Sequence, residues 1–217
     1  MTKSAICVAL VLFSSSMLCA QSASIVPDAP SVAKASTTTA QAVPLGFDGK
    51  ARYFAQRMFS PWNIVTPAFG AGLGMATADS RLPREWRQGA GAFGRLYGTE
   101  IAALATFNTT KFLTGLALRE DPRYFRAEAG TKGGRLKHAL LFTLVDRTDS
   151  GRNMPAVSNF IASAAGGTVV NLFVPPPYNQ KKYAVSRSAV LLGYYAAGNV
   201  RREFTPEFNR LLKKFHL

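Results

Sequence analysis

Small residues recur every four positions in four segments of the chain, and this spacing constrains the fold more than any other feature of the sequence. The four stripes are Thr66, Gly70, Gly74 and Ala78; Gly94, Gly98 and Ala102; Ser158, Ala162 and Gly166; and Ala189, Gly193 and Ala197. Residues four apart share one face of an α-helix, and small side chains there let a second helix approach closely. The spacing predicts helices that cross through Gly/Ala faces.

Helix start and stop signals divide the chain into about six or seven helices. A hydroxyl residue precedes proline at Ser60-Pro61, Thr66-Pro67 and Thr205-Pro206, which is typical of a helix start because the missing N–H costs nothing there. The two-residue alternation of strands is rare. The expected helices cover residues 49–59, 61–78, 90–119, 134–147, 155–173, 183–198 and 205–215. The sequence predicts an all-α, compact bundle.

The first 20 residues have the features of a secretory signal peptide. Lys3 supplies the positive charge, residues 5–13 form the apolar core, and cleavage is expected after Ala20. The core is about half the ~20 residues of a membrane span. Cleavage would remove Cys7 and Cys19, which are the two cysteines of the chain, so thiol chemistry is not expected. We expect an exported protein of the periplasm or outer envelope.

Residues 21–47 form a low-complexity arm in which Pro27, Pro30 and Pro44 punctuate Ser, Thr, Ala and Gln. Few large apolar groups are present, so this arm is expected to be disordered. The chain as a whole is 47% hydrophobic and contains 15 phenylalanines, which is enough to bury a core. Residues 48–217 are therefore expected to form a single helical domain.

The chain is strongly basic, with 26 lysines and arginines against 12 carboxylates and a net charge of +14. The cations are dispersed and do not form the tract with interleaved aromatics that is typical of nucleic-acid binding. We expect no nucleic-acid partner. An anionic envelope surface, either lipid headgroups or wall polymer, suits dispersed charge better. The small-residue faces also allow a homo-oligomer.

Two long uncharged stretches leave membrane insertion open. Residues 153–180 contain 28 positions without a charge, and residues 58–78 contain 21. Both are long enough to span a bilayer. Polar residues such as Ser158 and Asn159 interrupt the first stretch, and Pro61 and Pro67 interrupt the second. Buried core helices explain the two stretches equally well.

Glu100 and Lys111 are the only charges between Leu96 and Leu118 in the longest expected helix. Eleven residues are almost three turns, so the two side chains share a face but lie ~16 Å apart. Each is expected to meet a partner from another helix or to reach the surface.

The titratable residues that could support catalysis lie between residues 120 and 152. His138 is the one well-placed imidazole, and Asp121, Asp146 and Asp149 supply carboxylates for an exported hydrolase acting on envelope lipid or polymer. The same side chains suit helix caps and ion pairs. No motif for a metal, a cofactor or a hydroxyl nucleophile accompanies them. A structural role is therefore the favoured interpretation.

Two groups of cations are candidates for binding anions. Lys132, Arg135 and Lys137 follow a glycine-rich turn at the start of a helix. Arg210, Lys213 and Lys214 lie opposite the apolar side of the last expected helix. Such a helix can lie on an anionic membrane or dock on its own bundle, and docking is the favoured interpretation.

Five segments between Arg84 and Phe215 are similar to an uncharacterised family of exported bacterial proteins that has no assigned activity. They are Glu120-Asp121-Pro122-Arg123-Tyr124-Phe125-Arg126, Arg147-Thr148-Asp149-Ser150-Gly151-Arg152, Pro175-Pro176-Pro177-Tyr178, Gly198-Asn199 and Glu203-Phe204-Thr205-Pro206-Glu207. The resemblance implies an exported, single-domain protein and no catalytic residues. We therefore predict a basic, non-enzymatic envelope protein, with an exported hydrolase and a membrane-inserted bundle as alternatives.

Overall fold

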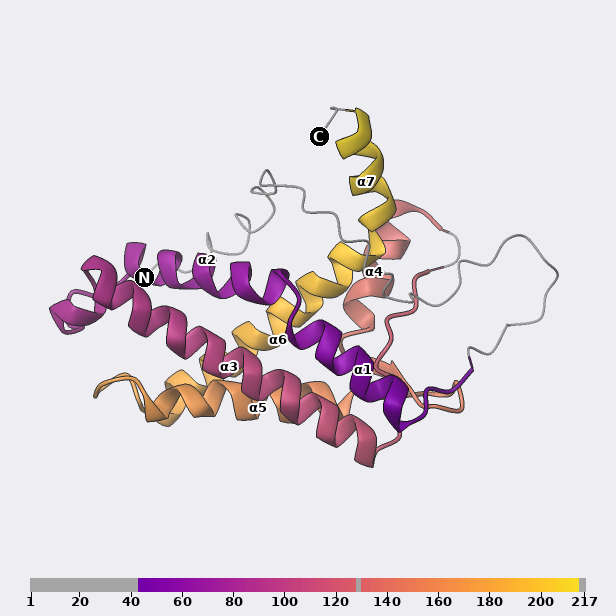
Figure 1. Cartoon of the computed structure of the whole chain (residues 1–217), viewed down its shortest axis with the longest axis horizontal. Coiled ribbons are helices and arrows are strands. Elements are labelled where there is room, and N and C mark those ends of the chain that lie inside the picture. The colour runs from indigo at the N-terminus through magenta and orange to yellow at the C-terminus, as the bar shows by residue number, and fades with distance from the viewer. Residues whose placement is uncertain (1–42, 128–129, 215–217) are drawn as a thin grey trace.

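The computed structural model describes residues 43–127 and 130–214, which fold as an all-α bundle (Figure 1). This confirms the predicted fold class. The predicted signal peptide and residues 21–42 of the predicted arm lie outside the described residues. The helices are α1 (Phe47–Met58), α2 (Trp62–Ala76), α3 (Gly89–Ala117), α4 (Lys132–Leu141), α5 (Val157–Val169), α6 (Lys181–Glu203) and α7 (Thr205–Lys214).

Helix α3 organises the bundle, because α1, α2 and α5 all pack against it (Figure 1). Helix α6 packs on α5 and α4. The main core joins Phe107 of α3, Ala162 of α5, and Leu191 and Tyr195 of α6. A smaller apolar cluster around Tyr124 and other aromatic residues lies beside α4.

Two of the four small-residue stripes lie at helix contacts. A Cβ atom on Gly166 of α5 would lie 2.7 Å from the Ala103 carbonyl oxygen of α3. One on the adjacent Gly167 would lie 2.7 Å from the carbonyl oxygen of Ala184 in α6. The stripe of α2 also faces α3, where Gly70 lies against Glu100. The α5 backbone therefore lies close to the backbones of α3 and α6 because the side chains are absent, whereas Gly70 of α2 meets the Glu100 side chain.

The other two stripes face outward, so the prediction that they cross other helices is wrong. Gly94 and Gly98 of α3 and Gly193 of α6 have no atom within 4 Å of an added Cβ. They are exposed or lie near the surface. A period of four identifies a shared face, but it does not say which way that face points.

The expected helix over residues 134–147 is too long. Helix α4 ends at Leu141, and β1 (Val145–Arg147) pairs antiparallel with β2 (Asn153–Pro155). The turn between the strands contains Gly151 at φ 81°, a left-handed conformation that glycine adopts at low cost. The Ala156 N–H donates to the Leu144 carbonyl and extends the pairing. Thr66-Pro67 does not start a helix, since Pro67 lies inside α2.

We expect Gly167→Ala to lower the free energy of unfolding by about 1 to 3 kcal/mol, because the new methyl group would overlap the α6 backbone. Gly193→Ala is the matched control in open space, where alanine should leave the stability unchanged or raise it by up to ~1 kcal/mol. Urea unfolding of both variants measures the difference. Equal stabilities would contradict the close α5–α6 contact.

Candidate functional site

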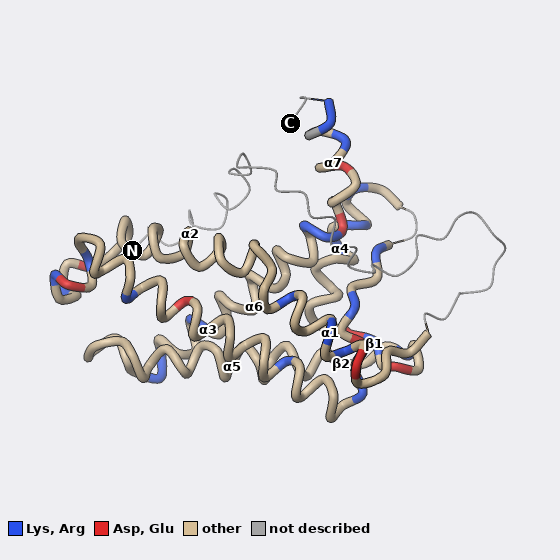
Figure 2. Tube along the Cα trace, in the orientation of Figure 1, with Lys and Arg blue, Asp and Glu red and all other residues tan. Residues whose placement is uncertain are grey.

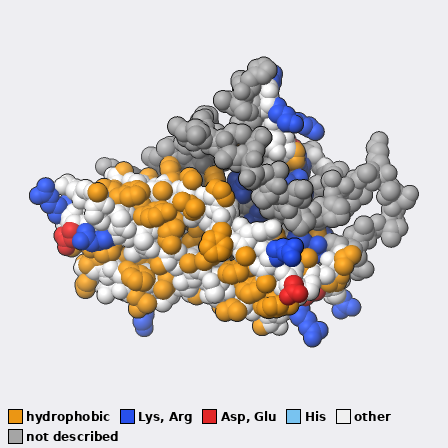
Figure 3. All heavy atoms as spheres, in the orientation of Figure 1, with side chains coloured by type: hydrophobic (Ala, Val, Ile, Leu, Met, Phe, Trp, Pro, Cys, Tyr) orange, Lys and Arg blue, Asp and Glu red, His pale blue; other side chains and the backbone are white. Residues whose placement is uncertain are grey.

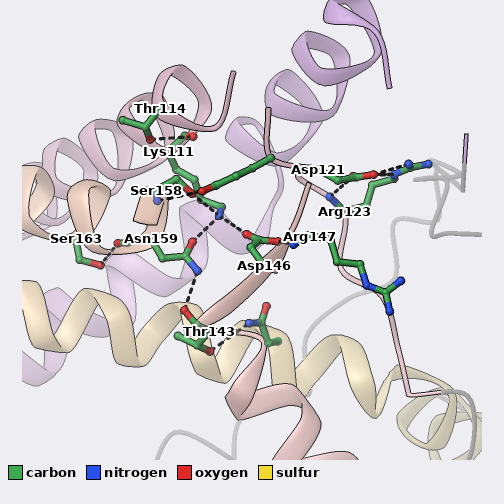
Figure 4. Close-up of polar contacts among 12 residues, drawn as sticks. Lys111, Thr114, Asp121, Arg123, Thr143, Asp146, Arg147, Ser158, Asn159 and Ser163 are labelled. Carbon is green, nitrogen blue, oxygen red and sulfur yellow. Dashed lines mark hydrogen bonds and ion pairs between the residues drawn. The ribbon is translucent and has the colours of Figure 1, made fainter. Parts of the chain in front are cut away.

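A buried lysine amine lies where α3, α5 and β1 meet (Figure 4). Lys111 Nζ of α3 lies 3.4 Å from Asp146 Oδ2 of β1 and 3.3 Å from Ser158 Oγ of α5. It also donates to Asn159 Oδ1, and it lies 4.8 Å from the centre of the Tyr195 ring. The expectation that Lys111 meets a partner from another element is confirmed.

The partners of Lys111 are themselves held by other buried groups. Ser158 donates to the Glu120 carboxylate, and Asn159 Nδ2 donates to the Thr143 carbonyl at 2.9 Å. Burial by itself would lower the pKa of Lys111. The Tyr195 and Asp146 side chains act in the opposite direction and outweigh burial, so the pKa of Lys111 is raised. The geometry is therefore that of a charged ammonium held by a satisfied polar network.

Two ion pairs adjoin this network on the side of α1. Lys50 Nζ lies 2.8 Å from both Asp149 carboxylate oxygens, and it donates to the Glu120 carbonyl at 2.9 Å. Asp121 accepts a two-pronged contact from Arg123, with distances of 2.9 and 2.6 Å. The Lys50 pair attaches α1 to the turn of the β-hairpin, and the Asp121 N–H attaches the segment after α3 by donating to the Arg147 carbonyl at 2.8 Å.

His138 belongs to a separate network on α4. The fully buried Glu203 of α6 accepts from Tyr124 Oη at 2.7 Å and from Arg135 Nε at 3.0 Å. His138 Nδ1 lies 3.4 Å from Tyr124 Oη and 3.7 Å from Glu203 Oε2. Burial and the Glu203 hydrogen bond raise the pKa of Tyr124 far above its usual range, so Tyr124 stays a donor.

The four predicted catalytic candidates thus divide into two groups. Asp121, Asp146 and Asp149 lie near one another around the β-hairpin, each in an ion pair. Among the described residues, no hydrogen bond or ion pair joins His138 to any of these aspartates. The cavity beside the aspartates has a volume of only about 40 Å³. That is space for a few water molecules rather than an enclosed substrate.

The three cations of α4 that were predicted to bind anions have different surroundings in the structure. Arg135 is occupied by Glu203 and by a close ion pair with Glu207. Lys132 and Lys137 of α4 are exposed. Within residues 43–127 and 130–214, no group of three acidic or histidine side chains could hold a metal ion.

Helix α7 projects away from the bundle, so the favoured interpretation that it docks there is wrong (Figure 1). Phe208 and Leu211 on its apolar side are 46% and 54% exposed. Arg210, Lys213 and Lys214 are exposed as well. At these described positions, both the apolar and the basic side of the helix are therefore exposed.

A second cavity of about 110 Å³ lies between α2, α3 and α6 and is lined by several cationic and polar side chains. These include Arg57, Arg201, Arg202, Asn108, Thr66 and Glu100. Burial and the nearby Arg202 lower the pKa of Arg57, and burial raises the pKa of Glu100. The cavity therefore gathers guanidinium groups with little carboxylate to balance them.

The outward face of α2 is uncharged. Trp62, Val65 and Phe69 are 43%, 57% and 42% exposed, and the exposed Gly72 and Ala76 continue the same face. Figure 2 shows no Lys, Arg, Asp or Glu along this helix, and Figure 3 shows hydrophobic side chains over much of the face in view. In the part of the chain that the structure describes, no helix is both long and apolar enough to span a membrane.

Sequence reasoning missed several residues that these sites depend on. Lys50, Asn108, Asn199 and Glu203 are buried polar groups, yet none was singled out for a site. Their signal is weak because each has polar or charged neighbours in the sequence, and nothing local shows which of these side chains is buried. Asn199 and Glu203 lie four apart on α6, and that shared face was the one available sign.

Comparison with known proteins identifies no relative: no protein-family model, curated protein or solved structure matches the chain. The resemblance to exported bacterial proteins stays a prediction.

We expect Lys111→Met to lower the free energy of unfolding by about 3 to 5 kcal/mol, because the buried Asp146 carboxylate would lose its cation. Adding Asp146→Asn should recover part of the loss by removing the unpaired charge. Lys137→Met on exposed α4 serves as the control and should change little. Denaturant unfolding measures all three, and a loss no larger than that of the control would contradict the network.

Proposed function

We propose that the protein is an exported, basic, non-enzymatic helical protein that associates with the anionic lipid surface of the bacterial envelope. One observation carries the proposal: among the described residues, fourteen lysines and arginines are exposed, against two exposed carboxylates, Asp48 and Glu85. Such an excess attracts anionic headgroups, at about 1 kcal/mol per cation near the surface.

The imbalance arises from the way the fold distributes its charges. Among the described residues, Glu120, Asp121, Asp146 and Glu203 are fully buried, whereas Lys50 is the one lysine or arginine buried to that degree and the Lys111 side chain is 11% exposed. Buried carboxylates neutralise internal amines and guanidinium groups and contribute little to the outer surface. The described exterior therefore has a higher ratio of cations to carboxylates, 14 to 2, than the whole chain, 26 to 12.

The outward face of α2 supplies an apolar surface beside these cations. Trp62 begins the face, and the Arg201 guanidinium lies 5.0 Å from the centre of its ring. Aromatic residues with neighbouring cations suit the boundary between headgroups and acyl chains. Helix α7 offers a second basic amphipathic surface. The charge complementarity favours an anionic membrane as the occupant of these faces.

The hydrolase alternative receives less support from the geometry. Asp121, Asp146 and Asp149 are each engaged by a cation, and His138 contacts a different network. General acid–base catalysis needs such groups within hydrogen-bond reach of one reacting atom. The binding role requires no such convergence.

The α2 face is tested by Val65→Ser/Phe69→Ser, which removes two exposed apolar side chains. We expect affinity for phosphatidylglycerol vesicles to fall at least about tenfold, since burying such a side chain is worth about 1.5 to 3 kcal/mol. Flotation of the purified chain with vesicles measures the affinity. Phosphatidylcholine vesicles should bind weakly, and ~1 M salt should release the protein by shortening the Debye length to about 3 Å.

Val185→Ser/Val190→Ser on α6 is the matched control, because these two side chains are 69% and 51% exposed. Its vesicle affinity should equal that of the unchanged protein. A larger loss in the α6 pair would contradict the choice of α2. Binding independent of lipid charge, or a stable oligomer that covers α2, would contradict the membrane-surface function.

Helix α7 is tested separately by reversing two exposed charges with Lys213→Glu/Lys214→Glu. Affinity for phosphatidylglycerol vesicles should fall at least about tenfold, because each lysine contributes about 1 kcal/mol and each glutamate is repelled. Lys181→Glu/Lys182→Glu at the exposed start of α6 changes the net charge equally. Equal losses in the two pairs would indicate a general charge effect and would contradict a specific contact by α7.

A further inference from the structure

We infer that the cavity between α2, α3 and α6 is a binding site for a phosphate group. The inference goes beyond the proposed membrane association, because the phosphate can belong to a lipid headgroup or to a soluble ion. It rests on Arg57 together with two buried polar groups that face the same cavity, Asn108 and Thr66.

Asn108 supplies the first independent sign of a ligand. The residue is 94% buried (6% exposed), and its Nδ2 is buried and has no hydrogen-bond partner among the described residues. It lies between the two cavities and lines both. A buried amide without a partner costs about 1 to 3 kcal/mol, so a fold that keeps one calls for a compensating acceptor. A phosphate oxygen is such an acceptor.

Thr66 supplies a second sign from another helix. Its hydroxyl is buried, has no hydrogen-bond partner and lines the same cavity from α2. Because Thr66 comes from α2 and Asn108 from α3, two helices present unsatisfied groups to one space. A hydroxyl donates readily to an oxyanion.

Arg57 supplies the charge. None of the ion pairs among the described residues includes it, and its guanidinium lies 5.3 Å from the centre of the Tyr195 ring. Burial and the positive charge of Arg202 nearby lower the pKa of Arg57, and a bound anion would offset the repulsion from Arg202. Guanidinium groups bind phosphate through paired N–H donors.

The remaining lining residues are compatible with this ligand. Arg202 also donates to Asn199 Oδ1 at 3.2 Å, and Arg201 contacts Trp62. Glu100 is the one carboxylate among the lining residues, eight positions before Asn108 on α3 and therefore about 12 Å away along the helix. The volume of about 110 Å³ holds several water molecules, enough space for a phosphate group without its acyl chains.

The test compares Arg57→Gln with Arg52→Gln, since both arginines lie on α1 and Arg52 is exposed. Calorimetric titration of the full chain with inorganic phosphate should show saturable binding that Arg57→Gln weakens at least about tenfold and Arg52→Gln leaves unchanged. Thr66→Val preserves shape and charge and should weaken binding about threefold or more. Circular dichroism confirms that each variant is folded.

Phosphatidylglycerol vesicles distinguish the two sources of phosphate. A lower vesicle affinity for Arg57→Gln than for Arg52→Gln assigns the site to a lipid headgroup, and equal vesicle affinities assign it to soluble phosphate. Equal phosphate affinity in Arg57→Gln, Thr66→Val and Arg52→Gln, or no saturable binding to the unchanged protein, overturns the inference. Absence of vesicle binding with phosphate binding intact overturns the proposed function alone.

Discussion

The desolvation of one lysine amine shapes the centre of this protein. An ammonium group removed from water is costly unless charged and polar partners surround it. Lys111 receives those partners from β1 and from the start of α5, so the hairpin and the fifth helix must both lie against α3. Asp146 reaches this position because residues 145–147 form a strand and do not continue the preceding helix. The short sheet therefore serves to place a carboxylate.

The pairing of carboxylates with internal lysines and arginines also determines how basic the surface is. Lys50, Lys111 and Arg135 are matched by buried or paired carboxylates, which leaves the exposed lysines and arginines without equivalent acids outside. Helix α2 has no charge along its length, and its outward side is apolar. Basic charge beside an apolar helix face links the packing of the core to the proposed association with anionic lipid. The cavity around Arg57 lies at the junction between that helix and the core.

Much of the fold could be predicted from local signals. The helices over 61–78, 90–119 and 205–215 agree with α2, α3 and α7 to within two residues at each end, because periodicity and capping act over a few neighbouring positions. The predicted end of α4 was wrong, since no glycine or proline marks a stop before residue 147, although Phe142, Thr143 and Val145 favour strands. The outward stripes of α3 and α6 show that spacing gives a face without its direction.

The sequence by itself determined that the chain is all-α, that it has an excess of positive charge, and that the longest helix holds a single lysine in an apolar stretch. Composition gives the charge, and the local periodicity of apolar residues gives the helices. Only the tertiary structure decided which carboxylate meets Lys111, that His138 belongs with Glu203, and that Asn108, Thr66 and Arg57 line one cavity. Those pairings join residues 9 to 65 positions apart in the chain, and the packing of whole helices determines them.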